Sequence, residues 1–559
     1  MAAVLPRRVR TIAGYLSAET TVTGDPTQPS PPSPPMPPRR RLAVSTAIVA
    51  VATAASRIAG LGREIAQAAY FGTTAAASAF TLASQVPNLF SNLFSQAALS
   101  AAFVPVFTEL MHENRKREAF KLASTLFWVI LVGLGALTLL WMGLADLITP
   151  LFTGHGISAG LTAGLSRVLF PVVLLLSLTG LFVGILQAYD EFTVPALAPA
   201  AWNLIILVLL IALHGVFHGA DTIYAYAVAW LAATVVQLIL IGGALGRIDF
   251  RLAFSFDWRD PRVRQVLLLF VPVTMSIGIV NLDIFINAGF GSLVSHQAPA
   301  AINDAFRIYM LPQGIFSVAV ATVLFPTLSR MAVRRDPKGM RHTLGNGMRQ
   351  INLLLIPSAA LLAVLATPIT RLLYQHHTFN AQSTHLVSIA LFTFAFSLPF
   401  AGLNLLLTRT FFALQKPWIP TKLAALNMVV DVIVSVALYK PLGIRGLVLG
   451  TVAANVVMTG LQLHRLRIGF NGRLEGGQTL MITARIAVAT VLMAAVGWGL
   501  WKGLDSLLGR ALIAQIFSMG VAGTAACLLY ARLVLVMRIP EARQIEFLIR
   551  QRLGRAQTA

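Results

Sequence analysis

The stretch "ASRIAGLGREIAQAAYFG" (residues 55–72) belongs to a run of apolar and small residues that is long enough to enter a bilayer. Arg57, Arg63 and Glu64 interrupt this run well inside its ends. A charge at the bilayer centre costs about 2.5–3.5 kcal/mol on insertion scales, so charges that persist there usually face a partner or a water-filled cavity. The stretch therefore predicts a membrane helix whose charged side chains have a specific role.

The composition of the whole chain also indicates a membrane protein. Its 559 residues are 57% hydrophobic and 11% charged, whereas soluble domains are about 25% charged. The formal net charge is +22, but the basic residues fall between apolar runs, not on one soluble basic face. We therefore expect an all-α integral membrane protein and no nucleic-acid partner. The single cysteine, Cys527, excludes an intrachain disulfide.

Runs of roughly 20 apolar residues each predict a spanning helix. They predict fourteen, centred near residues 57, 91, 133, 177, 204, 233, 279, 316, 358, 397, 428, 455, 491 and 523. Most Lys and Arg residues fall in the termini and the even-numbered connections. The odd-numbered connections hold only Arg371, Lys440, Arg445, Lys502 and Arg510. By the positive-inside rule, this multi-pass chain has both termini in the cytoplasm.

An internal repeat predicts two lobes. "AYDEFTVPALAPAAWN" (188–203) resembles "ALQKPWIPTKLAALN" (413–427), and "FVPVF" (103–107) resembles "LFPTL" (324–328), at an offset close to six spans. An even number of spans per repeat relates the halves by a pseudo-two-fold axis along the membrane normal.

The expected organisation follows from the repeat and from the composition of the two ends. It comprises a disordered Pro-rich tail (1–42), an N-lobe of helices 1–6 (43–250), a C-lobe of helices 7–12 (251–470), helices 13–14 (471–537) and a basic tail (538–559).

Basic side chains inside the first and eighth spans suggest an anion site. Arg57 and Arg63 lie in the first span and Arg307 in the eighth. Arginine suits phosphate because its planar fork binds oxygens in a bidentate manner. Glu64 is seven residues from Arg57, two turns along the same helix face. We expect a cationic cavity that recognises an anion; the alternative is that Arg63 and Glu64 form a local structural pair near a glycine bend.

The second lobe carries acidic residues instead. Asp283 is in the seventh span, and Asn427 and Asp431 share one face of the eleventh. Thr451 can approach from the twelfth. Two carboxylates with amide and hydroxyl oxygens suit a monovalent cation such as sodium, or a proton relay. The alternative is a buried hydrogen-bonded cluster that only packs helices.

Several of these segments resemble one known family. "SRIAGLGREIAQAAYFG" (56–72), "PNLFSNLFSQAALSAAFVPVFTEL" (87–110), the stretch 168–204 and "FRIYMLPQGIFSVAVATVLFPTLSRM" (306–331) resemble the MurJ (MviN) family of lipid II flippases. That family belongs to the multidrug/oligosaccharidyl-lipid/polysaccharide exporter superfamily. The resemblance covers roughly residues 45–540 and includes the same fourteen-span count.

The resemblance implies a function and a set of site residues. It implies an inner-membrane flippase that moves lipid II, the undecaprenyl-pyrophosphate-linked peptidoglycan precursor, to the outer leaflet by alternating access, with helices 13–14 forming a groove for the lipid tail. The implied partners are lipid II, membrane lipids and the cell-wall synthesis machinery. The substrate-binding positions would be Ser56, Arg57, Arg63, Glu64, Pro87, Asn88 and Arg307, and a sodium site would fall on Asp283, Asn427, Asp431 and Thr451.

The chain departs from the family pattern in the second span. Ser78, Ser91, Asn92 and Gln96 are uncharged where the family usually carries charges of both signs. The expectation that follows is that the first-span arginines carry more of the anion binding. The same departure keeps open the export of another lipid-linked oligosaccharide.

Two other classes of function can be weighed against the flippase. A drug/cation antiporter of the same superfamily would need an acidic cavity, which the arginines argue against. A membrane enzyme would need clustered carboxylates such as Asp-Asp-x-x-Asp, and none occurs. The ATP-binding pattern G-x-x-x-x-G-K-[ST] is also absent. We expect no enzymatic activity and no cofactor other than a coupling ion.

Overall fold

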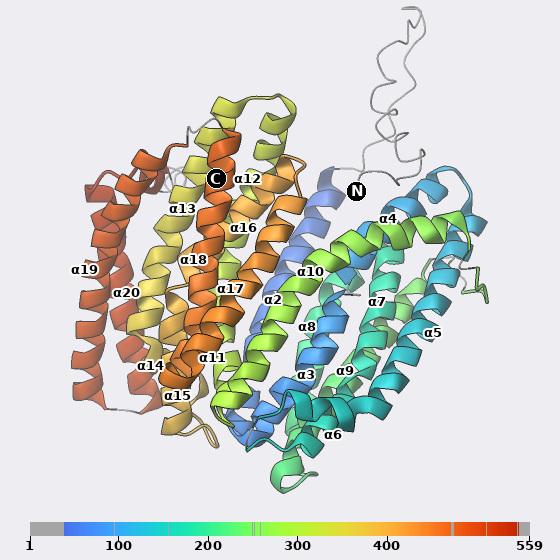
Figure 1. Cartoon of the computed structure of the whole chain (residues 1–559), viewed down its shortest axis with the longest axis horizontal. Helices are drawn as coiled ribbons and strands as arrows, with labels where there is room; N and C mark the ends of the chain where they lie inside the picture. Colours follow the sequence, from blue (N-terminus) through green and yellow to red (C-terminus); the bar gives the residue numbers. More distant parts are fainter. Residues whose placement is uncertain are drawn as a thin grey trace, which may run out of the picture. The chain divides into compact units, whose positions relative to one another are not determined.

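The computed structural model describes residues 39–93, 96–154, 156–248, 250, 252–257, 259–470, 474–509, 511–544 and 546. Residues Val49–Ala559 form one compact unit. Of the Pro-rich tail predicted at 1–42, residues 1–38 lie outside the described part, and so do residues 547–559 of the predicted basic tail. The described residues form helices and their connections, with no strand among them (Figure 1).

Ten helices or helix pairs in the described part are long and apolar enough to cross a membrane. An eleventh span results if the bent pair α15 (Ala381–Ala395) and α16 (Leu398–Ala413) counts as one. The other three predicted centres, near residues 57, 91 and 279, fall in helices outside this count. The structure therefore supports an all-helical membrane fold with ten or eleven apolar spans, and the number fourteen stays a prediction.

The first helical group contains α2 to α9. Its two main cores are mostly aliphatic, and each includes aromatic rings: Phe103 and Phe107 belong to one, and Phe80 and Tyr226 pack together in the other, with ring centroids 4.6 Å apart. The helices of this group are α2 (Arg39–Phe71), α3 (Ala75–Leu93), α4 (Gln96–His112), α5 (Lys116–Ile148), α6 (Ala159–Leu169), α7 (Pro171–Ala188), α8 (Thr193–Leu213) and α9 (Tyr224–Leu245).

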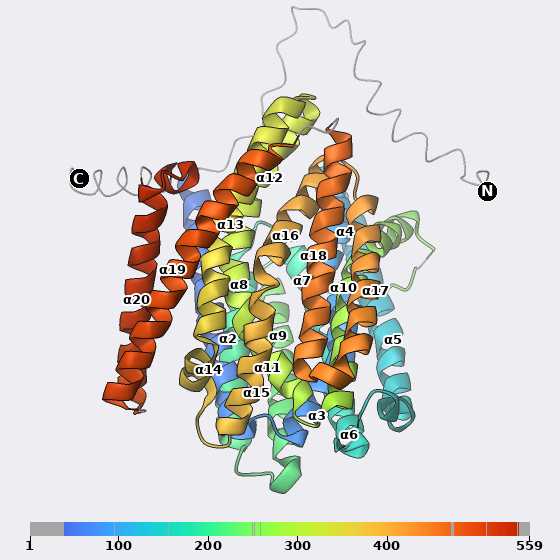
Figure 2. The same ribbon diagram turned by 60° about the vertical axis from the view of Figure 1, so that its left-hand side comes forward.

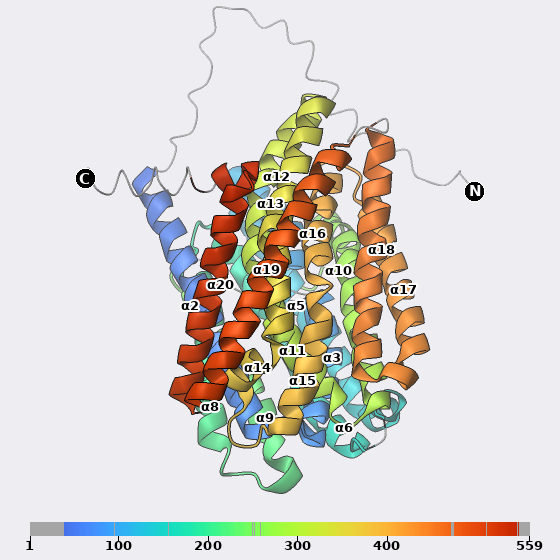
Figure 3. The same cartoon turned by 90° about the vertical axis from the view of Figure 1, so that its left-hand side faces the viewer.

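The second helical group contains α11 to α18 and has one large apolar core. Its long pair α17 and α18 stands side by side in Figure 3. Besides α15 and α16, its elements are α11 (Ala298–Pro312), the π-helical turn η4 (Gln313–Ser317), α12 (Val318–Val333), α13 (Pro337–Val364), α14 (Ala366–Tyr374), α17 (Trp418–Leu442) and α18 (Ile444–Gly469). Helix α10 (Pro261–Val294) packs against α3 and α4 of the first group and against α17 of the second.

The stretches that suggested a repeat occupy comparable places in the two groups. Pro195 and Pro420 each stand at the third residue of a helix, in α8 and α17. Pro171 opens α7, and Pro399 is the second residue of α16. The proline positions agree with a repeat, whereas the lobe symmetry itself stays a prediction.

The last two helices, α19 (Gly476–Leu508) and α20 (Leu512–Val536), pack against each other, and α19 packs on α13 (Figure 2). Arg349 of α13 is buried and bonds to two acids beyond the second group. Its Nη1 lies 3.1 Å from Glu475 at the start of α19, and its Nε donates to buried Glu541 after α20. Apolar residues around Ile486 and Val534 complete this junction. The helix pair is thus fixed to α13 by charge and by packing.

Candidate functional site

Arg57 extends from α2 to the π-helical turn of the second group. Its side chain is exposed, and a Cβ added at Gly314 would lie 3.3 Å from Arg57 Nη1. A larger residue at position 314 would therefore press on the guanidinium. π-Helical turns inside α-helices are frequent at functional sites, and this one follows α11 directly.

Glu64 and Arg307 form a second contact between the same two elements. Arg307 Nε is 3.7 Å from Glu64 Oε1, and the Arg307 side chain is 44% exposed. Glu64 follows Arg57 by seven residues, and Arg307 precedes Gly314 by seven. Seven residues span about two helical turns, so α2 and α11–η4 face each other in antiparallel register. The predicted shared face of Arg57 and Glu64 is present. We call this contact line the α2–α11 seam (Arg57, Glu64, Arg307 and Gly314).

Arg63 points away from the seam, into the first group. Its guanidinium lies 5.1 Å from the ring centroid of Trp202 and 5.5 Å from that of Trp230, and it hydrogen-bonds to Glu64. The side chain is 7% exposed, and its buried Nε has no hydrogen-bond partner in the described part. The local Arg63–Glu64 pair considered from the sequence exists. Whether Arg63 also binds substrate stays a prediction.

Ser56 is held by a side chain that sequence reasoning did not identify. Asn203 Nδ2 of α8 lies 3.4 Å from both Ser56 Oγ and the Ser56 carbonyl. A Cβ at Gly60 would be in ordinary contact with Asn203, 3.6 Å away. Asn203 closes the repeated stretch 188–203, so the repeat was the available signal. The α2 helix continues through Gly60 without a break.

The second-span residues lie on α3. Pro87 is buried within the helix and Asn88 is half-buried. Ser78, uncharged where the family is usually charged, is fully buried, and its Oγ accepts a hydrogen bond from the Ala300 backbone N–H at 3.3 Å. This position therefore links α3 to the first turn of α11. The side chains of Ser91, Asn92 and Gln96 lie outside the described part of the structure.

Asp304 is a buried acid that sequence reasoning missed. It precedes Arg307 by three residues on α11 and is 2% exposed. Its Oδ2 has no hydrogen-bond partner among the described residues. The available signal was a carboxylate one helical turn before Arg307.

A second polar cluster joins α10, α17 and α18. Asp431 of α17 is 1% exposed and accepts hydrogen bonds from three side chains. The donors are Asn287 Nδ2 at 3.0 Å, Ser435 Oγ at 3.0 Å and Thr451 Oγ1 at 3.1 Å. Asn287 and Ser435 were not predicted, although each follows a predicted aspartate by four residues and so shares its helix face.

Asp283 and Asn427 each carry a side-chain oxygen that has no hydrogen-bond partner in the described part. The carboxyl groups of Asp283 and Asp431 lie close enough for their charges to interact. Asp283 Oδ1 and Asn427 Oδ1 are buried and have no hydrogen-bond partner in the described part. An all-oxygen donor set with unpaired buried oxygens fits a hard cation. Among the described residues, no group of three or more His, Cys, Asp and Glu side chains is placed to hold a metal ion.

A family model described as "Lipid II flippase MurJ" matches residues 67–513. A probable lipid II flippase MurJ of Rhizobium tropici is 31% identical over 471 residues, which cover 82% of this chain and 87% of the relative. The lipid II flippase MurJ of Burkholderia cenocepacia is 30% identical over 66% of this chain and 73% of its own length.

Two solved structures show the same fold at low identity. "Lipid II flippase MurJ, inward closed conformation" superposes with a TM-score of 0.72 at 22% identity, covering 88% of this chain and 98% of the other. An inward-facing multidrug resistance MATE transporter gives 0.63 at 16% identity, covering 74% and 94%.

Proposed function

The chain belongs to the lipid II flippase MurJ family, and on that premise we propose that it carries lipid II across the bacterial cytoplasmic membrane. In this proposal the precursor enters from the inner leaflet and leaves to the outer leaflet by alternating access of the two helical groups. Both termini lie in the cytoplasm, as the distribution of Lys and Arg indicates. The observation that carries the proposal is the pair of exposed arginines, Arg57 and Arg307, on the α2–α11 seam.

The charges of the seam match a pyrophosphate. Arg63 neutralises Glu64 from within the first group, which leaves Arg57 and Arg307 as exposed cations on opposite groups. Guanidinium groups bind phosphate oxygens through paired, charge-assisted hydrogen bonds. A pyrophosphate held by both residues would link α2 to α11–η4. Its release would free the two groups to separate.

Contacts at one end of the helices support an inward-open starting state. Thr378 N–H donates to the Ala69 carbonyl at 3.0 Å, and the Thr73 hydroxyl donates to Ser383 at 2.8 Å. Ser292 Oγ donates to the Phe152 carbonyl at 3.1 Å. All of these residues lie near connections that the positive-inside rule assigns to the outside. We therefore propose that the groups are closed on the outside, ready to receive cargo from the cytoplasm.

The closed outer end brings Gly154 close to the backbone of Ser292, and this is possible because glycine has no side chain. A Cβ added at Gly154 would lie 2.0 Å from the Ser292 carbonyl oxygen, a distance that real side chains do not adopt. Position 154 therefore requires glycine for as long as the outer end is closed.

We propose that a monovalent cation, sodium or a proton, binds between Asp283 and Asp431. Asn427 and Thr451 would supply neutral oxygens, and Asn287 and Ser435 would hold Asp431 in place. The bound cation would offset the repulsion between two carboxylates at a buried site. Without the cation, one of the two carboxylates must keep a proton. Cation binding at such a site can therefore respond to a cation gradient across the membrane.

The test is lipid II at the outer leaflet. A strain depleted of its own flippase and rescued by this chain should expose lipid II to an externally added lipid II-cleaving toxin. Rescue of growth without any lipid II accessible from outside would contradict the proposed cargo. It would favour a different lipid-linked oligosaccharide.

A further inference from the structure

A partly buried chain of hydrogen bonds starts at the acidic cluster and continues along α18. Thr451 Oγ1 donates to Asp431 Oδ2. One turn later, Asn455 Nδ2 donates to the Thr451 carbonyl at 3.0 Å and to Ser397 Oγ at 3.0 Å. Neither Asn455 nor Ser397 belongs to the predicted cation site, so the chain extends beyond it.

The direction of the Asn455 amide is fixed by a side branch. Asn404 Nδ2 donates to Asn455 Oδ1 at 3.0 Å, and Thr459 Oγ1 donates to Asn404 Oδ1 at 2.8 Å. Because the Asn455 oxygen accepts from Asn404, its nitrogen must face Ser397. This network leaves one arrangement in which every amide is paired.

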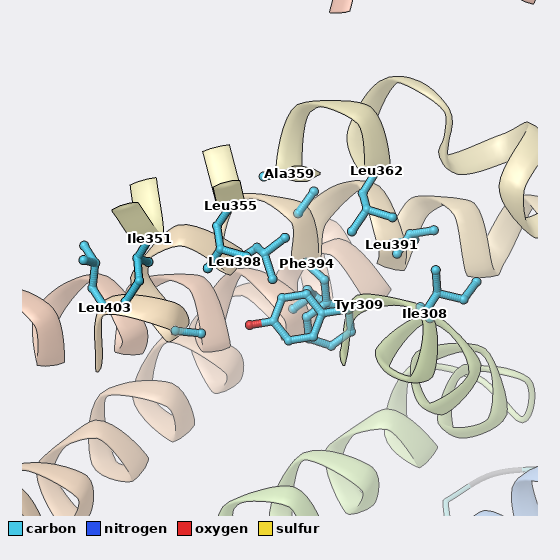
Figure 4. Packing of buried hydrophobic residues seen from close by; sticks show 14 of the residues in the cluster. Ile308, Tyr309, Ile351, Leu355, Ala359, Leu362, Leu391, Phe394, Leu398 and Leu403 are labelled. Carbon is cyan, nitrogen blue, oxygen red and sulfur yellow. The ribbon is translucent and has the colours of Figure 1, made fainter. Parts of the chain in front are cut away.

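The chain ends on α11 at Tyr309. Ser397 is fully buried where α15 meets α16 at a 49° bend, and its Oγ lies 3.4 Å from the Tyr309 hydroxyl. Figure 4 shows Tyr309 and Phe394 among the apolar side chains in the core of the second helical group. Their ring centroids are 5.3 Å apart. A buried hydroxyl that is left without a hydrogen-bond partner in such surroundings is unfavourable, so Tyr309 and Ser397 are expected to move together.

Tyr309 and Arg307 lie on opposite faces of α11. Two residues along a helix turn the side chain by about 200°, and the burial pattern agrees, since Tyr309 is buried and Arg307 is exposed. One face of α11 therefore contacts the end of the polar chain, and the other carries the arginine that meets Glu64.

We propose that Asn455, Ser397 and Tyr309 are positioning residues that couple cation binding at Asp283 and Asp431 to the placement of Arg307. The inference rests on the proposed cation site. When the cation occupies the site, the Thr451 hydroxyl can turn its oxygen toward it and give up its bond to Asp431. The turn of α18 that carries Asn455 then shifts, and Ser397 and Tyr309 transmit this shift to α11. Coupling of this kind is carried by packed networks that have two discrete arrangements.

The experiment places a reporter on the exposed face of α11. Met310 is 42% exposed and lies one turn beyond Arg307. In a Cys527→Ser background, Met310→Cys is labelled with a maleimide in sodium chloride and in choline chloride of equal ionic strength. We expect sodium to change the labelling rate by about fivefold, the lower range of typical coupling between sites. Tyr309→Phe, which removes only the hydroxyl, and Asn455→Ala should each remove this sodium response.

Sodium binding is measured separately as the sodium-dependent rise in melting temperature. Tyr309→Phe should keep that rise, whereas Asp431→Asn should lose it. The matched control is Ser388→Ala, because Ser388 is a buried serine of α15 whose hydroxyl donates to the Thr384 carbonyl of its own helix. Ser388→Ala should keep both the sodium response of the reporter and the sodium-dependent rise in melting temperature.

The remaining outcomes overturn either the proposed coupling or the proposed cation site. A sodium response of the reporter that survives in Tyr309→Phe and Asn455→Ala overturns the coupling and leaves the cation site standing. A melting-temperature rise without any reporter response in the parent protein also overturns the coupling. A rise that survives in Asp431→Asn overturns the cation site itself, and the inference falls with it.

Discussion

Arg307 of α11 lies 3.7 Å from Glu64 of α2, and the same carboxylate hydrogen-bonds to Arg63 on its own helix. Glu64 is thus shared between an exposed guanidinium from the second group and a buried one from the first. Loss of the buried guanidinium should therefore affect stability more than loss of an exposed one.

Arg63→Ala should destabilise the protein, and Arg57→Ala should not. Removal of Arg63 leaves a buried carboxylate with fewer partners and empties the space between Trp202 and Trp230. Breaking a buried pair from one side costs about 3–5 kcal/mol, while exposed substitutions stay within about 0.5 kcal/mol. Melting curves of the detergent-purified variants measure the difference. Equal melting temperatures would contradict the stacked, buried placement of Arg63.

Arg57→Ala should abolish rescue of a flippase-depleted strain although the protein is made in normal amounts. The reason is the loss of one of two exposed cations proposed to hold the pyrophosphate. Arg485→Ala is the matched control, because Arg485 is also an exposed membrane arginine, and among the described residues it bonds to Met537 and Met481. Colony counts and immunoblots test the pair. Normal growth of the Arg57 variant would rule out its role in cargo binding.

Gly154→Ala should open the outer end. The added methyl group meets the Ser292 carbonyl in the closed arrangement, so open arrangements gain population. Thr73 is buried at the closed end, and in a Cys527→Ser background a Thr73→Cys reporter should react faster with an impermeant maleimide added outside. Gly160→Ala serves as the control, since its nearest neighbour would be 3.9 Å away. Identical labelling in both variants would contradict the proposed closure.

The folded protein should lose stability in acid because the carboxylate of Glu475 becomes protonated. Burial raises the pKa of this carboxyl, but hydrogen bonds with Arg349 and His342 outweigh burial and hold the pKa below the ordinary value of 4.5. A lowered pKa in the folded state contributes stability that is present above the unfolded-state pKa and is lost as pH falls through the folded-state pKa. Glu475→Gln should therefore show a smaller fall in melting temperature between pH 7 and the acid range than the parent protein.

The control for this measurement is Glu113→Gln. Glu113 pairs with Arg115 in an exposed position, and such pairs contribute little to stability. Its melting profile should follow that of the parent protein. If Glu475→Gln does the same, the junction at Arg349 does not depend on this acid.

Local spacing predicted much of the site. The seven-residue interval between Arg57 and Glu64 correctly placed both on one face of α2, because helical periodicity is a property of the chain itself. The same rule applied to Asp283 and Asp431 would have found Asn287 and Ser435, each four residues further on. Span centres near 204 and 455 likewise fall in α8 and α18, since apolar run length is read directly from sequence.

The direction of Arg63 could not be predicted in the same way. Its partners Trp202 and Trp230 come from α8 and α9, and only the packed fold brings them to α2. The contact of Arg57 with Gly314 and the path from Asp431 to Tyr309 also join distant segments. In each case local periodicity gives the face of a helix, while the neighbour on that face is decided by tertiary packing.

The junction at Arg349 has a consequence for how an amphiphilic cargo is handled. Because α19 and α20 are fixed to α13, a lipid tail resting on them would travel with the second helical group, while Arg57 on α2 belongs to the first. Rocking of the groups would then change the distance between the two ends of the bound molecule. A cargo with a flexible isoprenoid chain can absorb that change, whereas a short, rigid amphiphile would be strained. The attachment of α19 and α20 to α13 would therefore select for cargo with long tails.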